Sequence, residues 1–219
     1  FGNSCSHETA VETYFPLENG AVWVYEAELA TDGKVTPLRQ IFYVDDSTLS
    51  SETADASLAT LHGERKLYKF LEDGIYYVTN SNNSVKDPKR KSDYQLFLPN
   101  KLEIGKSWLN QTNLMLLKAS GPWETPLAIQ GAIPTRYRIL SKEETVVTKT
   151  RTFENCLVIE GIGRGFLYSG DYLNDLEVMI EDKRWFAPQV GLVKIVRRER
   201  GRNKHTKFIQ LEMLLKNVR

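Results

Sequence analysis

Apolar and polar side chains alternate at every second position along most of this chain, and that period restricts the fold more than any other feature of the sequence. In residues 21–29 the even positions 26 and 28 carry glutamate, and four apolar side chains fall on the opposite face of an extended chain: Trp23, Tyr25, Ala27 and Leu29. Apolar spacing of three and four residues over a helical length is almost absent. The pattern predicts β-strands with at most short helices.

Further strands follow from the same pattern. Residues 67–72 and 75–79 are expected to form a hairpin, because Asp73-Gly74 between them is typical of a type I′ turn. Other expected strands are 136–140, 145–148, 156–162, 176–180 and 209–215. Residues 46–61 fit a short helix and an irregular loop equally well. Usual strand lengths imply roughly ten strands. We therefore expect an all-β fold in which antiparallel strands form a curved sheet, a half-barrel or a sandwich.

Length and composition fit one ordinary domain. The chain has 219 residues, of which 41% are hydrophobic, and β folds of that size are commonly single domains. We expect an N-terminal segment at 1–13, which could act as a tether, and a β-rich domain at 14–219. The formal net charge of +1 gives no sign of a nucleic-acid partner.

The start of the chain and the two cysteines bear on the cellular compartment of the protein. No apolar run is long enough for a membrane span, and the sequence begins at Phe1, which is typical of an exported protein whose leader has been removed. Three alternatives remain for the cysteines. Cys5 and Cys156 could form a disulfide in an oxidising compartment, Ser4-Cys5-Ser6 could be a lipidation site, or both thiols could be free, with Cys156 a small buried apolar residue.

Blocks near both ends resemble an uncharacterised family of bacterial lipoproteins and periplasmic proteins. Tyr14-Phe15-Pro16-Leu17 with Gly20, Trp23 and Tyr25 resembles the family's opening block; Phe153 to Cys156 and Phe186 to Lys194 resemble its closing segments. Arg151 and Gln189 stand where the family usually has glycine. The resemblance implies an antiparallel β fold and a location in the bacterial cell envelope, and it implies no activity. We expect the protein in the periplasm, either free or anchored there by a lipid on Cys5. The turn residues in these blocks also have purely architectural explanations.

Catalytic motifs are missing from the sequence. It contains none of the common nucleophile or zinc motifs, and its three histidines are widely separated. Residues 161–165, Gly-Ile-Gly-Arg-Gly, lack the context of a phosphate-binding loop and are interpreted as a turn with a bulge. We expect no catalytic residues, no metal and no cofactor.

Charge is distributed unevenly. Residues 1–60 carry ten Asp or Glu against two Lys or Arg, and residues 183–219 carry eleven Lys or Arg against two Glu. The centre of the basic region is interpreted as the connection between the last two strands, with these candidate anion-binding residues: Arg197, Arg198, Arg200, Arg202 and Lys204. Such a cluster could meet anionic lipid, lipopolysaccharide or an acidic envelope protein. It could equally be a solvated turn that protects a sheet edge.

Aromatic side chains suggest a second binding surface. Five of them could line the concave side of a curved sheet, where a hydrophobic ligand or a glycan would bind: Trp23, Tyr25, Tyr43, Tyr77 and Trp185. Core packing is the alternative. The sequence thus favours a non-catalytic envelope protein that binds a hydrophobic ligand, a glycan or an envelope partner. An envelope hydrolase of glycan or ester bonds, with carboxylates from distant strands, and a structural protein without ligand are the alternatives.

Overall fold

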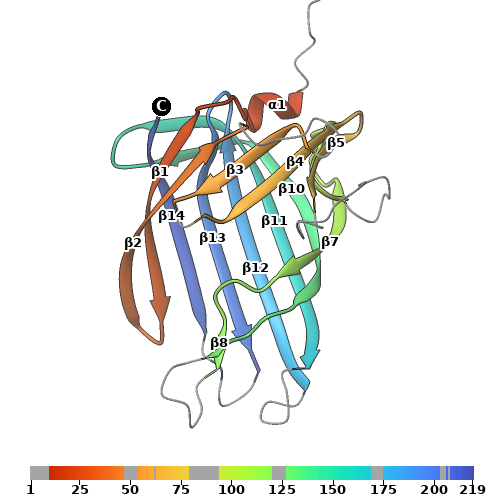
Figure 1. Ribbon diagram of the computed structural model, residues 1–219, viewed down its shortest axis with the longest axis vertical. Helices are drawn as coiled ribbons and strands as arrows, with labels where there is room; N and C mark the ends of the chain where they lie inside the picture. The colour runs from red at the N-terminus through yellow and green to blue at the C-terminus, as the bar shows by residue number, and fades with distance from the viewer. Residues whose placement is uncertain are drawn as a thin grey trace, which may run out of the picture.

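The protein, seen in a computed structural model, is built almost entirely of antiparallel strands (Figure 1). The structure describes residues 10–46, 54–61, 63–78, 94–119, 127–168, 175–202, 206 and 208–219. Within these ranges a short helix, α1 (Ala10–Tyr14), precedes fourteen strands. The strands are β1 (Val22–Thr31), β2 (Lys34–Val44), β3 (Ala56–Thr60), β4 (Arg65–Leu71), β5 (Gly74–Val78), β6 (Tyr94–Pro99), β7 (Ser107–Asn113), β8 (Lys118–Ala119), β9 (Leu127–Ala128), β10 (Ala132–Val147), β11 (Thr152–Tyr168), β12 (Asp175–Ala187), β13 (Gly191–Gly201) and β14 (Ile209–Val218).

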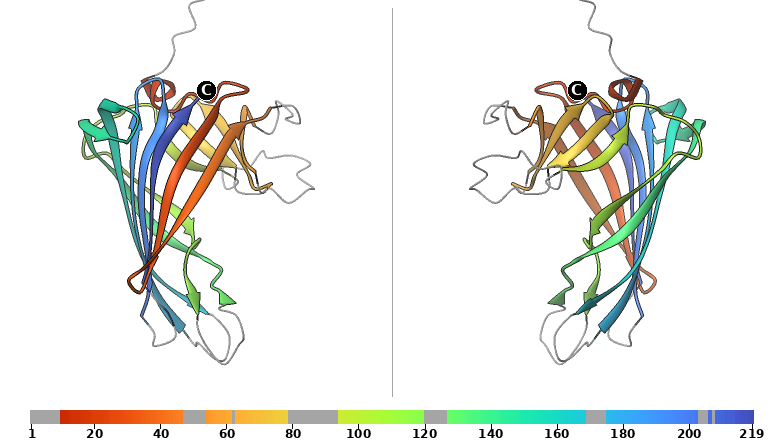
Figure 2. Two further views of the ribbon diagram at one scale, coloured as in Figure 1. Left: turned by 90° about the vertical axis from the view of Figure 1, so that its left-hand side faces the viewer. Right: turned by 90° about the vertical axis from the view of Figure 1, so that its right-hand side faces the viewer.

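Twelve strands form one sheet that curls until its ends nearly meet. Its order is β6-β5-β4-β3-β2-β1-β14-β13-β12-β11-β10-β7, and β8 pairs only with β9. The long strands β10–β14 make a tall wall, and the short strands β3–β6 lie opposite its upper part (Figure 2). At the seam, the Asn110 side-chain amide of β7 donates to the Leu96 carbonyl of β6 at 2.7 Å. The all-β prediction is confirmed, and the twelve strands of the main sheet are close to the roughly ten that were predicted.

Local predictions were mostly confirmed at the level of strands and less so at turns. The hairpin at 67–79 exists, but its connection is Glu72-Asp73, and Gly74 is the first residue of β5, paired with Leu71. Glycine is needed there because a Cβ would lie 2.3 Å from the Leu98 carbonyl oxygen of β6. Part of 46–61, left open between helix and loop, is strand β3, whose backbone pairs with β2 and β4.

The interpretation of residues 161–165 as a turn with a bulge was wrong. They continue β11 in regular pairing with β12. The three glycines face inward, and a Cβ on Gly161 would lie 2.4 Å from the Tyr137 ring of β10. The missing side chains leave room for β10 side chains to pack against the β11 backbone where the sheet curls, and the Tyr137 ring buries the backbone of Gly161.

The interior is layered along β12. Its inward positions are first apolar, at Val178 and Ile180, then charged, at Asp182 and Arg184, and then apolar again at Phe186. The lower apolar cluster includes Leu117, Ile133 and Leu176, and the upper one includes Phe15, Tyr68, Phe97 and Phe186. The sheet therefore encloses a charged layer between two hydrophobic layers.

Candidate ligand cavity and its charged layer

The charged layer comes from two neighbouring strands. Asp182 of β12 is paired in register with Arg197 of β13, and the next inward residues along the two strands are Arg184 and Glu199. All four are largely withdrawn from solvent; the Arg197 side chain is 3% exposed. Buried charges are tolerated when each finds an opposite charge and hydrogen bonds.

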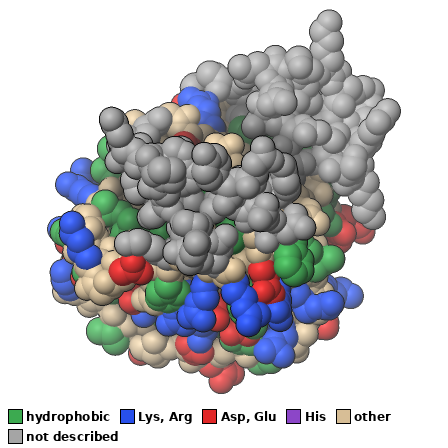
Figure 3. Space-filling model, turned by 90° about the horizontal axis from the view of Figure 1, so that it is seen from below, with side chains coloured by type: hydrophobic (Ala, Val, Ile, Leu, Met, Phe, Trp, Pro, Cys, Tyr) green, Lys and Arg blue, Asp and Glu red, His purple; other side chains and the backbone are tan. Residues whose placement is uncertain are grey.

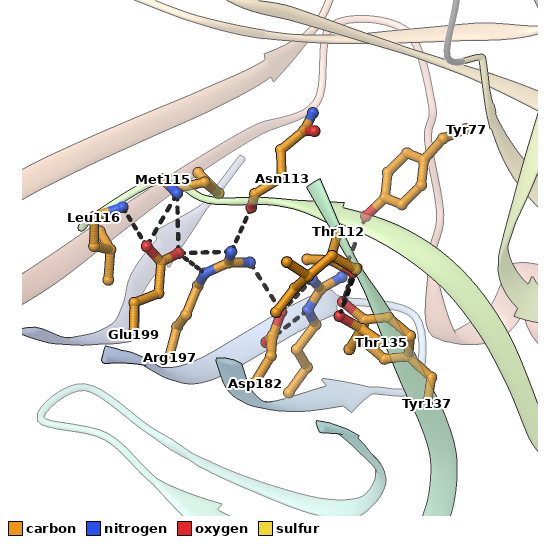
Figure 4. Close-up of polar contacts among 12 residues, drawn as sticks. Tyr77, Thr112, Asn113, Met115, Leu116, Thr135, Tyr137, Asp182, Arg197 and Glu199 are labelled. Atoms are coloured by element: carbon orange, nitrogen blue, oxygen red, sulfur yellow. Dashed lines mark hydrogen bonds and ion pairs between the residues drawn. The ribbon is translucent and has the colours of Figure 1, made fainter. Parts of the chain in front are cut away.

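Asp182 is held between two guanidinium groups. Arg184 donates through Nε and Nη2 to its two carboxylate oxygens at 3.0 and 2.5 Å, and Arg197 donates through Nη1 at 3.3 Å (Figure 4). Burial by itself raises the pKa of Asp182, but the two arginines outweigh it and hold the pKa below its ordinary value of 3.8. Asp182 is therefore a permanent anion at neutral pH.

Glu199 holds a strap across the interior, residues 114–117, which link β7 to β8. Its carboxylate accepts hydrogen bonds from the backbone N–H groups of Met115 and Leu116, each at 2.9 Å (Figure 4). It also accepts one from the next N–H group, that of Leu117, at 2.9 Å. Arg197 donates to Glu199 at 2.8 Å and to the Asn113 carbonyl oxygen at 2.6 Å. One ion pair thus fixes the middle of a segment whose ends are held by backbone hydrogen bonds, from Leu114 N–H to the Gly131 carbonyl oxygen and from Ile129 N–H to the Leu117 carbonyl oxygen.

Arg184 continues the network toward the upper layer. Its Nη1 donates to the Tyr77 hydroxyl at 3.2 Å, and its guanidinium lies 5.8 Å from the Phe97 ring centre and 5.6 Å from that of Tyr137. The Tyr137 hydroxyl is in turn hydrogen-bonded to Thr112 at 3.1 Å. Burial raises the pKa of Tyr137, so its hydroxyl stays protonated.

A mainly apolar cavity of about 180 Å³ lies beside this layer. Its wall comes from β1–β6, β12–β14, the segment before β1 and the strap, and its apolar lining includes Trp23, Tyr25, Phe42, Phe97, Leu211 and Met213. Arg184 and Arg197 also line it, and exposed Glu64 and Lys66 are among its outer residues. The cavity combines a large aromatic surface with a few polar groups, the usual chemistry of a small-molecule site.

Three of the five predicted aromatic residues line the cavity: Trp23, Tyr25 and Tyr77. Tyr43 and Trp185 are not among its lining residues. Trp185 follows inward Arg184 and therefore faces outward, where its Nε1 donates to Glu144 at 2.8 Å and where Lys183 and Lys194 lie over its ring. Whether any of these residues contacts a ligand stays a prediction.

Asp182, Arg184 and Glu199 were missed as site residues. A sequence signal for the residues of β12 was available. Asp182 and Arg184 continue the alternating face of Val178 and Ile180, and such a face normally points into the core. Leu211 and Met213 of β14, in the predicted strand 209–215, also line the cavity.

The basic residues that were predicted to form the connection between the last two strands lie mostly within a strand. Residues 197–200 belong to β13, paired with β12 and β14, so they are not the connection, and Arg197 points into the interior. Arg198 donates to Glu181 and Arg202 to Glu177, each at 3.3 Å, and Arg200 lies 5.2 Å from the Phe208 ring. Lys204 lies outside the described residues. From below, basic, acidic and hydrophobic side chains are interspersed on the described surface (Figure 3). Anion binding by this surface stays a prediction.

Cys156 is fully buried in an apolar cluster, with its Sγ 3.6 Å from the Phe153 carbonyl oxygen. Burial raises the pKa of its thiol to about 11, which makes it unreactive. Cys5 lies outside the described residues, so its lipidation and its disulfide with Cys156 stay predictions.

The three family-like blocks meet in space. Trp23 Nε1 donates to the Val190 carbonyl oxygen and the Tyr25 hydroxyl to that of Leu192, both at 2.7 Å. The Tyr14 hydroxyl donates to the Asn155 carbonyl oxygen at 3.2 Å, which brings in the third block. Gln189, which replaces the usual glycine, has a φ of 59°, a backbone conformation that glycine adopts most easily. These contacts support an architectural role for the blocks.

Neither a metal site nor a membrane-spanning helix is found in the described part of the chain. No group of three His, Cys, Asp or Glu residues there could hold a metal ion. None of its helices is long and apolar enough to cross a membrane. All three histidines fall outside the described ranges.

Comparison with known proteins gives distant structural matches. No protein-family model matches the chain, and no curated protein matches it at a significant level. A candidate exported protein with a YmcC-like fold from Bacteroides fragilis aligns over 94% of this chain and 99% of its own, with 13% identity and a TM-score of 0.43. A candidate lipoprotein from Parabacteroides distasonis aligns over 94% and 98%, with 13% identity and a TM-score of 0.42. Similarity at this level transfers no function.

Proposed function

We propose that this chain is a non-catalytic protein of the bacterial cell envelope that holds a hydrophobic ligand inside its curled sheet. The observation that carries the proposal is the cavity of about 180 Å³, lined by aromatic and aliphatic side chains from both ends of the chain. Removing an apolar molecule from water into such a space contributes about 25 cal/mol for each Å² buried. The envelope location rests on the resemblance of the sequence blocks.

The charged layer favours binding over hydrolysis. A general acid must hold a proton near the working pH, yet Asp182 has its pKa lowered by two arginines and is locked between them. Glu199 is occupied by three backbone N–H groups and Arg197. Both carboxylates are used to hold the fold together, which leaves neither as a proton donor to a substrate.

Uptake of the uncharged fluorescent probe N-phenyl-1-naphthylamine tests the proposal. The probe should bind with increased fluorescence, and Leu211→Trp, which fills the cavity, should weaken binding at least about tenfold, equivalent to about 1.4 kcal/mol. Glu212→Trp is the matched control, because Glu212 is the neighbouring residue and pairs with Lys194 on the outer face. Circular dichroism should show that both variants are folded. Equal binding by the two variants would place the probe outside the cavity and reject the proposal.

A further inference from the structure

Positive charge predominates on the wall of the cavity. The charged lining residues are three cationic ones and one acidic one: Lys66, Arg184, Arg197 and Glu64. The carboxylates that pair with the two arginines, those of Asp182 and Glu199, are fully buried and are not among the lining residues. A ligand in the cavity therefore meets the guanidinium groups directly and is separated from their carboxylate partners. Because Coulomb energy falls with distance, such a wall favours a negative charge over a positive one.

Arg184 keeps hydrogen-bond donors for a ligand. A guanidinium group has five N–H donors, and Arg184 uses three of them, two on Asp182 and one on the Tyr77 hydroxyl. The other two have no partner in the described part of the chain. The Arg184 side chain is 15% exposed, against 3% for that of Arg197. Of the two arginines, Arg184 is therefore the one whose free donors an anionic group in the cavity can reach.

Lys66 adds a second accessible cation. It lies in β4 opposite Leu58 of β3, and both residues line the cavity. Its ammonium group forms no ion pair with any residue that the structure describes, including exposed Glu64. The Lys66 charge also helps to lower the pKa of Asp182, which indicates that it lies near the charged layer. Arg184 and Lys66 thus offer unused donors to the same space.

From these observations we propose that the ligand is an amphiphile with one anionic head group, a fatty acid in chemical class, whose carboxylate binds Arg184 and Lys66 while its chain lies against the apolar wall. This inference rests on the proposed function. Hydrogen bonds between a carboxylate and a guanidinium are roughly twice as strong as those between neutral groups. Arg184 can form them without releasing Asp182. An ammonium head group would meet like charges, and an uncharged head group would gain hydrogen bonds without the charge attraction.

Displacement of the bound probe compares head groups at equal chain length. Decanoate, decylamine and 1-decanol would each compete with N-phenyl-1-naphthylamine at pH 8, where decanoate is ionised and decylamine is protonated. Decanoate should displace the probe at a concentration about tenfold lower than decylamine and about threefold lower than 1-decanol, whereas acetate, the head group without the chain, should not displace it. Equal or tighter binding of decylamine, 1-decanol or acetate overturns the inference. A protein that takes up neither the probe nor any of the long-chain compounds overturns the proposed function itself.

Removal of the Lys66 charge tests where the head group binds. Lys66→Gln should weaken decanoate binding by about three- to fivefold and leave the affinity for the uncharged probe within about twofold. Lys69→Gln is the matched control, because it removes the same charge from the same strand, where Lys69 pairs with Asp55 and does not line the cavity. Lys69→Gln should change neither affinity. If Lys66→Gln binds decanoate as tightly as the unmodified protein, or if both variants weaken it equally, the head group does not bind at this wall.

Discussion

Asp182 shows how single residues hold this interior together. It is completely buried and accepts hydrogen bonds from two arginines that come from adjacent strands. Removing one member of a buried ion pair leaves its partners charged and unpaired, which costs more than the pair itself contributes. The interior charges are therefore a structural requirement of the sheet as well as a wall of the cavity.

Asp182→Asn should accordingly destabilise the fold by about 3–5 kcal/mol, measured by urea denaturation. Glu26→Gln, which breaks exposed ion pairs with Lys149 and Lys216, is the control and should cost much less. Because the folded-state pKa of Asp182 is lower than its unfolded value, its contribution is complete above about pH 4 and is lost as the pH falls toward the folded-state pKa. The variant should lose less stability than the unmodified protein on acidification through this range. An equal loss in both proteins would assign the acid sensitivity to other carboxylates.

Among the elements, β1 and β13 are joined by side chains as well as through the sheet. The two strands are not neighbours, because β14 lies between them, yet Trp23 and Tyr25 reach across to carbonyl oxygens at the start of β13. The same two side chains line the cavity. The opening and closing blocks therefore shape one wall of the cavity.

Tyr25→Phe should destabilise the protein by about 1–3 kcal/mol, because the Leu192 carbonyl oxygen loses the hydroxyl that donates to it inside the protein. Thermal denaturation measures the change. Tyr43→Phe is the control; Tyr43 lies in the neighbouring strand β2 and does not line the cavity. A Tyr25→Phe variant as stable as the Tyr43→Phe variant would contradict the structural role given to this hydrogen bond.

At the same scale, the sequence predicted the positions of strands better than it predicted which of their side chains face the interior. Alternation identified the strands β1 and β14 and, for β1, the residues that share one face, since the two sides of that strand differ in polarity. Trp185 of β12 was predicted to line the concave side, but its neighbour Phe186 lines the cavity instead, and both residues are buried. Trp185 is buried although it faces outward, because it belongs to one hydrophobic cluster with Val146 and Phe153 at the end of the β10–β11 hairpin.

For the whole molecule, closure of the sheet creates the site. The cavity collects residues from Phe15 to Met213, and its charged layer depends on the pairing of Asp182 with Arg197, fifteen positions apart. Pairing between strands is not visible in a single sequence, so Arg197 was grouped with exposed basic residues although it lies inside. The aromatic residues were recognisable as candidates, whereas the enclosed space and the charged layer beside it required the fold.

Native mass spectrometry of the protein purified from its own cell envelope tests the central claim most directly. We predict a complex heavier than the chain by the mass of a small hydrophobic molecule that is released on denaturation, and no such complex for Leu211→Trp. A mass that persists after denaturation would instead report a covalent modification, such as a lipid on Cys5. Recovery of the unmodified protein without any releasable molecule, together with no uptake of N-phenyl-1-naphthylamine, would contradict the account.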